Sequence, residues 1–222
     1  MSGVHDMGGK TRHFGQLKRI DPAEKPFGAA WEGRAFAVTL LANRAATGSN
    51  LHAFRHALDR VPEQEYLADY YGRWLCSAEI LLVDSGLLAP GAVEARARTM
   101  MGEDVMEPVD PEPHKPTMES GGGGNLREID APRAFAVGDR ILASSGAASG
   151  HSRLPGYAVG IAGTVTALRP AQVFPDSAAL FVAENPQHVY SVTYDAHDLW
   201  GDGSEAFTLT LDLYESYLER VQ

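Results

Sequence analysis

The first half of the chain repeats its apolar residues at helical spacing. Residues 29–46 are rich in Ala and Leu. Four apolar side chains of this segment share one face: Trp31, Ala35, Val38 and Ala42. The pattern predicts a helix that ends at Gly48. A second helix follows over 51–58, with Ser49 or Asn50 as its N-cap, because these side chains accept hydrogen bonds from exposed backbone N–H groups.

The longest helix is predicted over residues 63–83, with Gly86 at its end. Its aromatic residues stand at i, i+4 and i+8 on one side: Tyr66, Tyr70 and Trp74. This stripe is either ordinary core or, because a buried tyrosine hydroxyl needs a hydrogen-bond partner, part of a polar cavity or an interface. Pro90 fits the first turn of a further short helix that reaches Met100.

Between residues 102 and 132 the character of the chain changes. Acidic residues dominate, prolines recur, and glycines occupy positions 121–124. This composition is typical of a linker that is first extended and then flexible. It separates the helical half from the C-terminal half of the chain.

After Pro132 the hydrophobic period becomes that of strands. Short strand-like segments stand between Gly, Pro and Asp turns, at 135–141, 160–168, 188–194 and 207–213. They predict a small antiparallel barrel of the SH3-like type. A barrel of this size has no large interior, so we expect its loops to carry its function.

These patterns together predict an α+β chain of four segments. An extended N-terminal arm, a helical domain, an acidic Pro/Gly-rich linker and an SH3-like β-barrel domain occupy residues 1–28, 29–101, 102–132 and 133–222. The arm is rich in glycine and poor in apolar residues, so it is either disordered or laid across a partner.

Composition narrows the functional classes. The net charge of −10 over 222 residues argues against a nucleic-acid partner, because phosphate binding needs clustered Lys and Arg. No window approaches the roughly 20 unbroken apolar residues of a membrane span, and residues 1–10 lack the apolar core of a signal peptide. The single cysteine, Cys76, excludes a disulfide framework and a Cys-rich metal site, and it fits a cytoplasmic protein.

Few side chains could carry chemistry without a partner. His5 and Asp6 are adjacent, and His52 and His56 stand four apart on a predicted helix. Both pairs are possible metal ligands, but neither has a third ligand near it in the sequence. We therefore predict no metal in this chain, and we interpret the two helical histidines as an exposed pair.

One arginine stands out in the barrel half. The stretch 150–157 holds Arg153 between a glycine turn and a Leu-Pro step. One interpretation is a solvated loop charge. The other is a guanidinium group directed at an anion, because its fixed N–H donors suit paired oxyanions.

Short motifs run in order from one end of the chain to the other. They are Gly3-Val4-His5-Asp6-Met7-Gly8-Gly9, Trp31-Glu32, Ala35-Phe36, Phe54-Arg55, Tyr66-Leu67, Tyr70-Tyr71 with Trp74, Gly150-His151-x-Arg153, Val173-Phe174-Pro175-Asp176, Glu184-Asn185-Pro186, Leu199-Trp200-Gly201 and Asp212-Leu213-x-Glu215-Ser216-Tyr217-Leu218-Glu219. In this order the motifs resemble the β-subunit of nitrile hydratase. The closing motif is the most specific.

The resemblance implies an enzyme that hydrates nitriles to amides at a metal held outside this chain. In the family, the α-subunit binds Co(III) or Fe(III) with a Cys-x-x-Cys-Ser-Cys claw in which two cysteines are oxidised. Two β-subunit arginines donate hydrogen bonds to the sulfur oxygens, and they match Arg55 and Arg153. Tyr70 matches a tyrosine of the hydrogen-bond network at the metal. Positions that line the substrate channel match or neighbour Leu51, Phe54, Tyr71 and Trp74.

The resemblance also implies an obligate αβ pair, or (αβ)₂, with an interface above about 2,000 Å². Three departures from the family pattern stand in this sequence. Gly156 occupies a position where the family usually has arginine, and the arm has one extra residue near His13. The helix between Leu67 and Tyr70 is one residue short, which leaves the register of Tyr70 against Tyr71 open.

Two alternatives stay open. A thiocyanate-hydrolase-like subunit would share the fold, although its β-like sequence is typically divided between two chains. A non-catalytic accessory protein or metallochaperone for the α-subunit would usually resemble only the helical half.

Overall fold

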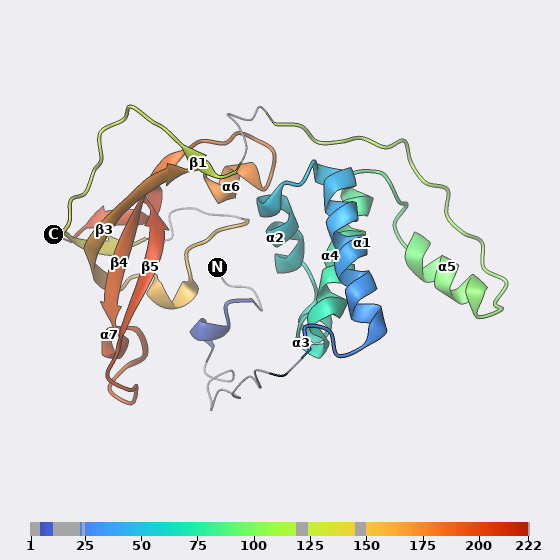
Figure 1. The fold of residues 1–222 in the computed structure, drawn as a ribbon, viewed down its shortest axis with the longest axis horizontal. Helices are drawn as coiled ribbons and strands as arrows, with labels where there is room; N and C mark the ends of the chain where they lie inside the picture. The colour runs from blue at the N-terminus through green and yellow to red at the C-terminus, as the bar shows by residue number, and fades with distance from the viewer. Residues whose placement is uncertain (1–4, 11–22, 24, 119–123, 145–149, 222) are drawn as a thin grey trace. The chain divides into compact units, whose positions relative to one another are not determined.

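The computed structural model describes residues 5–10, 23, 25–118, 124–144 and 150–221 (Figure 1). The predictions for the rest of the arm, including its extra residue near His13, and for glycines 121–123 lie outside the described residues. The chain divides into two compact units. We call Gln16–Thr117 the helical unit, and Met1–Gly15 together with Met118–Gln222 the sheet unit.

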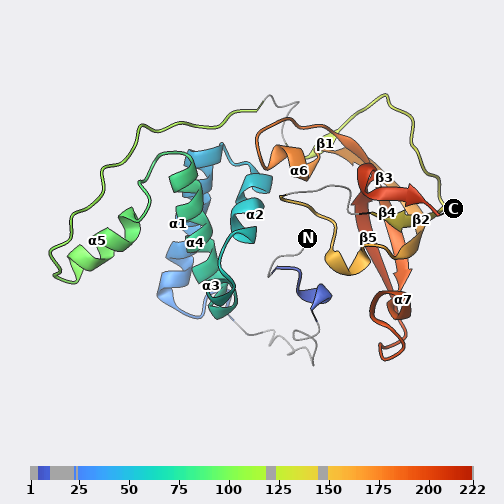
Figure 2. The same ribbon diagram turned by 180° about the vertical axis from the view of Figure 1, so that it is seen from behind.

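The helical unit is built around a pair of long helices. Its helices are α1 (Ala30–Thr47), α2 (Leu51–Asp59), α3 (Glu63–Ala68), α4 (Tyr70–Asp84) and α5 (Ala92–Met100). Helices α1 and α4 lie side by side in both views (Figures 1 and 2), and α2 and α3 also pack on α4. Gly48 ends α1 in the left-handed conformation, with φ of 71°, as predicted.

Small side chains make the buried face of α1. The residues of this face repeat at helical spacing: Ala35, Thr39, Ala42 and Ala46. Small residues let two helices approach closely. The helical spacing predicted for Trp31, Ala35, Val38 and Ala42 is confirmed by α1, but only the two alanines are buried. Trp31 and Val38 are 36% and 50% exposed.

The long helix predicted over 63–83 is broken, and this prediction is wrong in its continuity. Asp69 is extended, with φ of −151° and ψ of 138°, between α3 and α4. Its carboxylate accepts hydrogen bonds from the backbone N–H groups of Tyr71 and Gly72, each at 2.8 Å. An aspartate at an N-cap satisfies donors that a helix start leaves open. The local cap therefore starts a new helix at Tyr70.

Asn50 caps α2 in the same way, and its removal is a test of how much that helix start contributes. Its Oδ1 accepts from the N–H groups of His52 at 3.0 Å and Ala53 at 3.1 Å. We expect Asn50→Ala to lower the free energy of unfolding by about 1 kcal/mol, measured as a lower midpoint in urea. Asn50→Asp keeps the acceptor and is the matched control. Equal midpoints for the two variants would contradict the capping role.

The start of α5 differs from its prediction. Gly91 is the N-cap, in the left-handed conformation with φ of 76°, and the helix begins at Ala92. Pro90 therefore lies before the helix rather than in its first turn. The proline shapes the entry to the helix without occupying it.

The acidic segment after α5 is partly tied to the helical unit. The backbone N–H of His114 donates to the Ser85 carbonyl at 2.8 Å. The Asp110 carboxylate accepts from the backbone N–H of Ala89, also at 2.8 Å. These contacts hold part of the predicted linker against the end of α4 and the loop after that helix.

The sheet unit contains one antiparallel sheet. Its elements are η1 (Met7–Gly9), β1 (Leu126–Arg127), β2 (Arg140–Ala143), η3 (Gly156–Ala158), β3 (Ala162–Gln172), α6 (Pro175–Ala178), β4 (Gln187–Asp195), α7 (Ala196–Trp200), β5 (Thr208–Tyr214), η4 (Glu215–Tyr217) and β6 (Leu218–Arg220). The strand order is β5-β4-β3-β2-β6, and β1 pairs with β3. Strands β3, β4 and β5 lie side by side in both ribbon views (Figures 1 and 2).

The α+β class is confirmed. Closure of the sheet into an SH3-like barrel is not seen, since β5 and β6 stay at opposite ends of the strand order among the described residues. The strands predicted over 188–194 and 207–213 form as β4 and β5. Most of 135–141 lies outside a strand, because β2 begins at Arg140. The pattern did not reveal the shortest strands, β1 and β6.

The core of the sheet unit lies around β4. Its largest fully buried side chains include Tyr190, Tyr194, Leu154 and Leu213. Leu154 belongs to the loop that carries Arg153, so this loop has an anchor in the core. The loop is therefore attached to the sheet unit by packing as well as by the chain.

Candidate functional site

One exposed face of α2 carries two of the predicted site residues. Leu51 and Arg55 stand four residues apart, so they share a side of the helix. Leu51 is 46% exposed and Arg55 is exposed as well. Phe54, between them in sequence, is buried at 7% exposure. The helix thus directs Arg55 outward while Phe54 fixes it to the unit.

An aromatic cluster joins the remaining predicted residues of the helical unit. Trp74 is its centre, with Phe54 at 5.3 Å and Phe36 at 5.5 Å between ring centroids. Tyr70 and Tyr71 lie at 5.9 Å and 6.1 Å from the same ring. The structure therefore brings Phe54, Tyr70, Tyr71 and Trp74 together. Such pairs stabilise beyond their buried area and hold the rings in fixed orientations.

The two neighbouring tyrosines have different surroundings. The Tyr71 hydroxyl donates to the Pro26 carbonyl at 3.1 Å, and its ring packs on Phe27 at 5.3 Å. Desolvation, with the neighbouring Tyr70 and Glu32 adding to it, raises the pKa of Tyr71. Tyr70 is 54% exposed. Tyr71 thus packs within the unit, and Tyr70 is the one that faces outward.

The sequence interpretation missed Arg73, which stacks on two tyrosines. Its guanidinium carbon lies 4.5 Å from the ring centroid of Tyr66 and 4.5 Å from that of Tyr70. Cation–π contacts of this kind restrain a ring that is otherwise exposed. Arg73 follows Tyr70 by three residues, and this helical spacing could have predicted the contact between the two side chains.

The loop that carries Arg153 is held by the sheet unit. His151, Ser152 and Leu154 are buried, whereas Arg153 itself is half-exposed. The backbone N–H of Arg153 donates to the Tyr217 hydroxyl at 3.1 Å. The charge of the Arg153 side chain acts on Tyr214 of the same unit, where it opposes the rise in the Tyr214 pKa that burial causes.

The Tyr217 hydroxyl has a second partner. It donates to a carboxylate oxygen of Asp176 in α6. Burial raises the pKa of Asp176, although the Tyr217 hydrogen bond and the charge of His151 act against that shift. Burial, together with the hydrogen bond to Asp176, also raises the pKa of Tyr217. The sequence showed both residues only as parts of family motifs, without any sign that they meet.

The far end of the same loop meets the N-terminal segment. The Asp6 carboxylate is 7% exposed and accepts from the backbone N–H of Gly156 at 2.9 Å. Burial, with the charge of Asp6 as a further cause, raises the pKa of the adjacent Tyr157. Asp6 therefore holds a backbone position, whereas its sequence had suggested at most a weak metal ligand.

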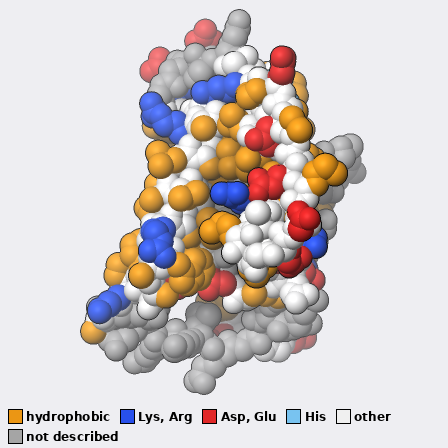
Figure 3. All heavy atoms as spheres, turned by 90° about the vertical axis from the view of Figure 1, so that its right-hand side faces the viewer, with side chains coloured by type: hydrophobic (Ala, Val, Ile, Leu, Met, Phe, Trp, Pro, Cys, Tyr) orange, Lys and Arg blue, Asp and Glu red, His pale blue; other side chains and the backbone are white. Residues whose placement is uncertain are grey.

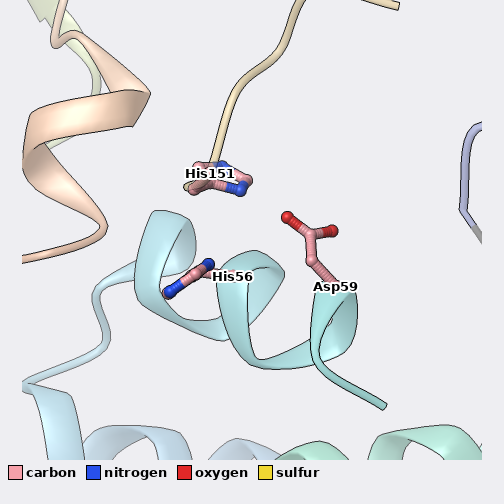
Figure 4. A group of neighbouring side chains, drawn as sticks. All are labelled: His56, Asp59 and His151. Atoms are coloured by element: carbon pink, nitrogen blue, oxygen red, sulfur yellow. The ribbon is translucent and has the colours of Figure 1, made fainter. Parts of the chain in front are cut away.

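The histidines on α2 differ from their prediction. His52 is 8% exposed and His56 is only partly exposed, so the interpretation of the two as an exposed pair is wrong. His56 and Asp59 project from α2, as Figure 4 shows. These two supply fewer ligands than the four of a structural zinc site. His151, also drawn there, belongs to the sheet unit.

Apolar side chains remain exposed on the helical unit. Figure 3 shows hydrophobic side chains spread over the face seen from the side where α1 and α5 lie in Figure 1. The exposed apolar residues of these two helices include Val38, Leu40, Leu41, Val93 and Met100. None of the helices that the structure describes combines the length and the hydrophobicity needed to cross a membrane.

Family models match both parts of the chain. A model of the nitrile hydratase beta subunit, N-terminal, matches residues 1–121, and one of the nitrile hydratase beta subunit, C-terminal, matches residues 124–220. The chain belongs to the nitrile hydratase β-subunit family. The resemblance expected from the motifs is thereby confirmed over almost the whole sequence.

Individual relatives agree with the family models. The chain is 34% identical to the nitrile hydratase subunit beta of Pseudomonas putida, over 99% of both chains. It is 31% identical to the low-molecular weight cobalt-containing nitrile hydratase subunit beta of Rhodococcus rhodochrous, over 98% of this chain and 99% of that one. A solved structure of the thiocyanate hydrolase apo-enzyme of Thiobacillus thioparus is also similar, at 28% identity. That likeness covers 40% of this chain and 78% of the other with a TM-score of 0.38, and no conclusion rests on it.

Both halves of the nitrile hydratase β-subunit family pattern therefore contribute predicted site residues here. Leu51, Phe54, Arg55, Tyr70, Tyr71 and Trp74 belong to the helical unit, and Arg153 belongs to the sheet unit. Within the helical unit the aromatic residues are brought together, and Arg55 stands beside them on α2.

Proposed function

We propose that this chain is the β-subunit of an enzyme that hydrates nitriles to amides, active only with an α-subunit. One observation carries the proposal: the chain matches nitrile hydratase β-subunits from end to end, with both family halves present. An accessory protein that resembled only the helical half would lack the second match. The joined halves also count against a divided, thiocyanate-hydrolase-like subunit.

The metal of this enzyme, cobalt or iron, belongs in our proposal to the α-subunit. A relative is named as cobalt-containing, yet this chain has only one cysteine, Cys76. Burial and the nearby Glu65 and Glu79 raise the pKa of the Cys76 thiol, which disfavours the thiolate that binds metals. The donor set for a thiolate claw is thus absent from this sequence, and a Cys-x-x-Cys-Ser-Cys motif in the partner would supply it. Bound there, the metal supplies Lewis acidity toward the nitrile.

Arg55 and Arg153 are the proposed hydrogen-bond donors to the oxidised cysteine sulfurs of that claw. Arg55 is an exposed residue and Arg153 a partly exposed one, which is compatible with contact to another polypeptide. Sulfur oxyanions buried at an interface are costly without charge-assisted donors. A planar guanidinium also fixes their geometry better than a lysine ammonium does.

Tyr70 is the proposed hydroxyl partner at the metal site. Its exposure of 54% and the Tyr71 hydrogen bond to Pro26 both favour Tyr70 for the outward role. The proposed channel wall consists of Leu51, Phe54, Tyr71 and Trp74. A rigid aromatic wall suits a small apolar nitrile, because it excludes water at little conformational cost.

The proposed assembly is αβ or (αβ)₂, in the cytoplasm. The exposed apolar residues of α1 and α5 support a large partner interface, since apolar patches mark association surfaces. A single cysteine, outside any disulfide, agrees with a reducing compartment.

Co-expression tests the proposal directly. We expect this chain alone to give no amide from a nitrile, and co-expression with a Cys-x-x-Cys-Ser-Cys α-subunit plus cobalt or iron to give steady turnover, measured by chromatography of the amide. Thiocyanate is assayed in parallel as the competing substrate. Turnover of thiocyanate but of no nitrile, or exchange of the α-subunit without any turnover, would contradict the proposed function.

A further inference from the structure

The Tyr217 hydroxyl stands between a carboxylate and the backbone of the loop that carries Arg153. It donates to Asp176 and accepts from the Arg153 N–H at 3.1 Å. Tyr217 is 3% exposed, and its ring packs on Phe174 at 5.6 Å and on Tyr214 at 5.8 Å between centroids. Its position is therefore set by the core before it meets the loop.

The hydrogen bond from the Arg153 N–H to the Tyr217 hydroxyl restrains the backbone at the residue that bears the guanidinium. The peptide is planar, so fixing the donor direction at Arg153 fixes the direction of its N–Cα bond, and the torsion φ then sets where Cβ lies. Two further contacts restrain the following residues: the buried Leu154, whose N–H donates to the Ser152 hydroxyl at 3.2 Å, and the bond from Gly156 to Asp6. The loop is thus restrained at Arg153 and again at Gly156.

The residues that restrain this loop come from distant parts of the sequence. Tyr217 is 64 positions from Arg153, and Asp6 is 150 positions from Gly156. Neither contact is needed to close a local turn. A core tyrosine and an N-terminal carboxylate therefore both bind the backbone of the loop that carries Arg153.

We propose that Tyr217 and Asp176 are positioning residues for Arg153, with Asp6 supporting the same loop at Gly156. The inference rests on the proposed function, in which Arg153 donates to oxyanions of the α-subunit. Tyr217 never touches those atoms. Asp176 orients the Tyr217 hydroxyl so that its oxygen lone pair faces the Arg153 N–H, and the guanidinium leaves the loop in one direction.

The protonation states agree with this arrangement. The raised pKa of Tyr217 keeps its hydroxyl neutral, so the same oxygen can donate to Asp176 and accept from Arg153. Misplacement of a catalytic donor by about 1 Å can cost about 100-fold in rate. A loop restrained at Arg153 and again at Gly156 avoids that misplacement.

Tyr217→Phe tests the proposal, and Tyr190→Phe is its matched control. Tyr190 is also buried, and its hydroxyl likewise donates to a carboxylate, Glu215, and accepts from a backbone N–H, that of Phe135 at 3.5 Å. Both variants lose a bond to a carboxylate and a bond from a backbone N–H, and Tyr217→Phe also loses a bond with Ser152. Both should therefore lower the Tm, and Tyr217→Phe at least as much as Tyr190→Phe. In the assembled enzyme we expect kcat to fall between about tenfold and about 100-fold for Tyr217→Phe, and to stay near the wild-type value for Tyr190→Phe. Equal losses of kcat in both variants would overturn the proposal.

A double-mutant cycle separates positioning from general damage. If Tyr217 acts through Arg153, Tyr217→Phe should change kcat little once Arg153 is lysine. Losses that simply multiply would overturn the inference. Asp176→Asn keeps an acceptor for the Tyr217 hydroxyl and should rescue what Asp176→Ala loses; equal losses from both would count against Asp176. The comparison of Asp176→Asn with Asp176→Ala also tests the proposal if the Tyr217→Phe variant does not fold.

Amide hydrogen exchange keeps the inference independent of the proposed function. In the full chain, Tyr217→Phe should speed exchange of the Arg153 amide while amides paired between β3 and β4 stay protected. Unchanged exchange at Arg153 would overturn the positioning role even in an active enzyme. A wild-type assembly without nitrile turnover, but with faster Arg153 exchange in the variant, would instead remove only the proposed function and leave the loop restraint standing.

Discussion

Lysine in place of Arg55 or Arg153 is expected to lower kcat of the assembled enzyme by about 100-fold, because removal of one preorganised donor to a catalytic oxyanion typically costs that much. Lysine keeps the positive charge but loses the planar pair of donors. The measurement is steady-state hydration of a nitrile by the co-expressed αβ enzyme. The binding of the α-subunit should change less than kcat does.

Two surface arginines provide matched controls for this experiment. Arg60, just after α2, pairs with Asp84, with a second contact at 3.1 Å. Arg169, in β3, bonds to the Ser191 hydroxyl at 2.8 Å. Lysine at either position keeps the charge on an exposed surface, so turnover should be unchanged. Wild-type turnover in both Arg55→Lys and Arg153→Lys would remove these residues from the proposed site.

The second large effect is expected at Gly163, where a methyl group has no room. A Cβ built there would lie 2.6 Å from Val192 Cγ1 and 2.8 Å from Tyr194 Cε1. Val192 and Tyr194 are both buried in the core of the sheet unit. Gly163→Ala should therefore lower the free energy of unfolding by about 1–3 kcal/mol, the usual cost of overpacking. Urea unfolding followed by tyrosine fluorescence measures the loss.

Gly203→Ala is the matched control for Gly163→Ala. A Cβ at Gly203 meets nothing within 4 Å. Both changes reduce the freedom of the unfolded chain alike, so the difference between them reports the steric clash alone. Equal unfolding midpoints would show that β3 and β4 can separate without cost, contrary to the tight contact between them.

Local signals in the sequence predicted several elements correctly. Gly48 ends α1 because glycine adopts a positive φ readily, and Asn50 starts α2 because its side chain accepts from its own neighbours. Each of these interactions spans a few residues, so a short stretch of sequence contains both partners. Strand β4 also forms where the sequence predicted a strand, although its burial does not alternate, since residues 188–192 are all buried.

Errors arose where a local pattern allowed two outcomes. The helical period runs through Asp69, yet its carboxylate competes with the helix by capping α4. Trp31 and Val38 are apolar and share a face with Ala35 and Ala42, yet only the two alanines are buried. A local cap decided the first case, and tertiary packing decided the second.

The sequence by itself determined the family, the α+β class and the identities of the proposed site residues, because ordered motifs and hydrophobic periods are local properties. The tertiary structure alone decided which tyrosine faces outward and what holds the Arg153 loop. The Tyr71 hydroxyl donates to the Pro26 carbonyl. Tyr217 and Asp6 accept hydrogen bonds from backbone N–H groups of the Arg153 loop, although both are far from it in the sequence. Contacts between residues far apart in the sequence depend on the tertiary fold, and no local hydrophobic period or motif spacing predicts them.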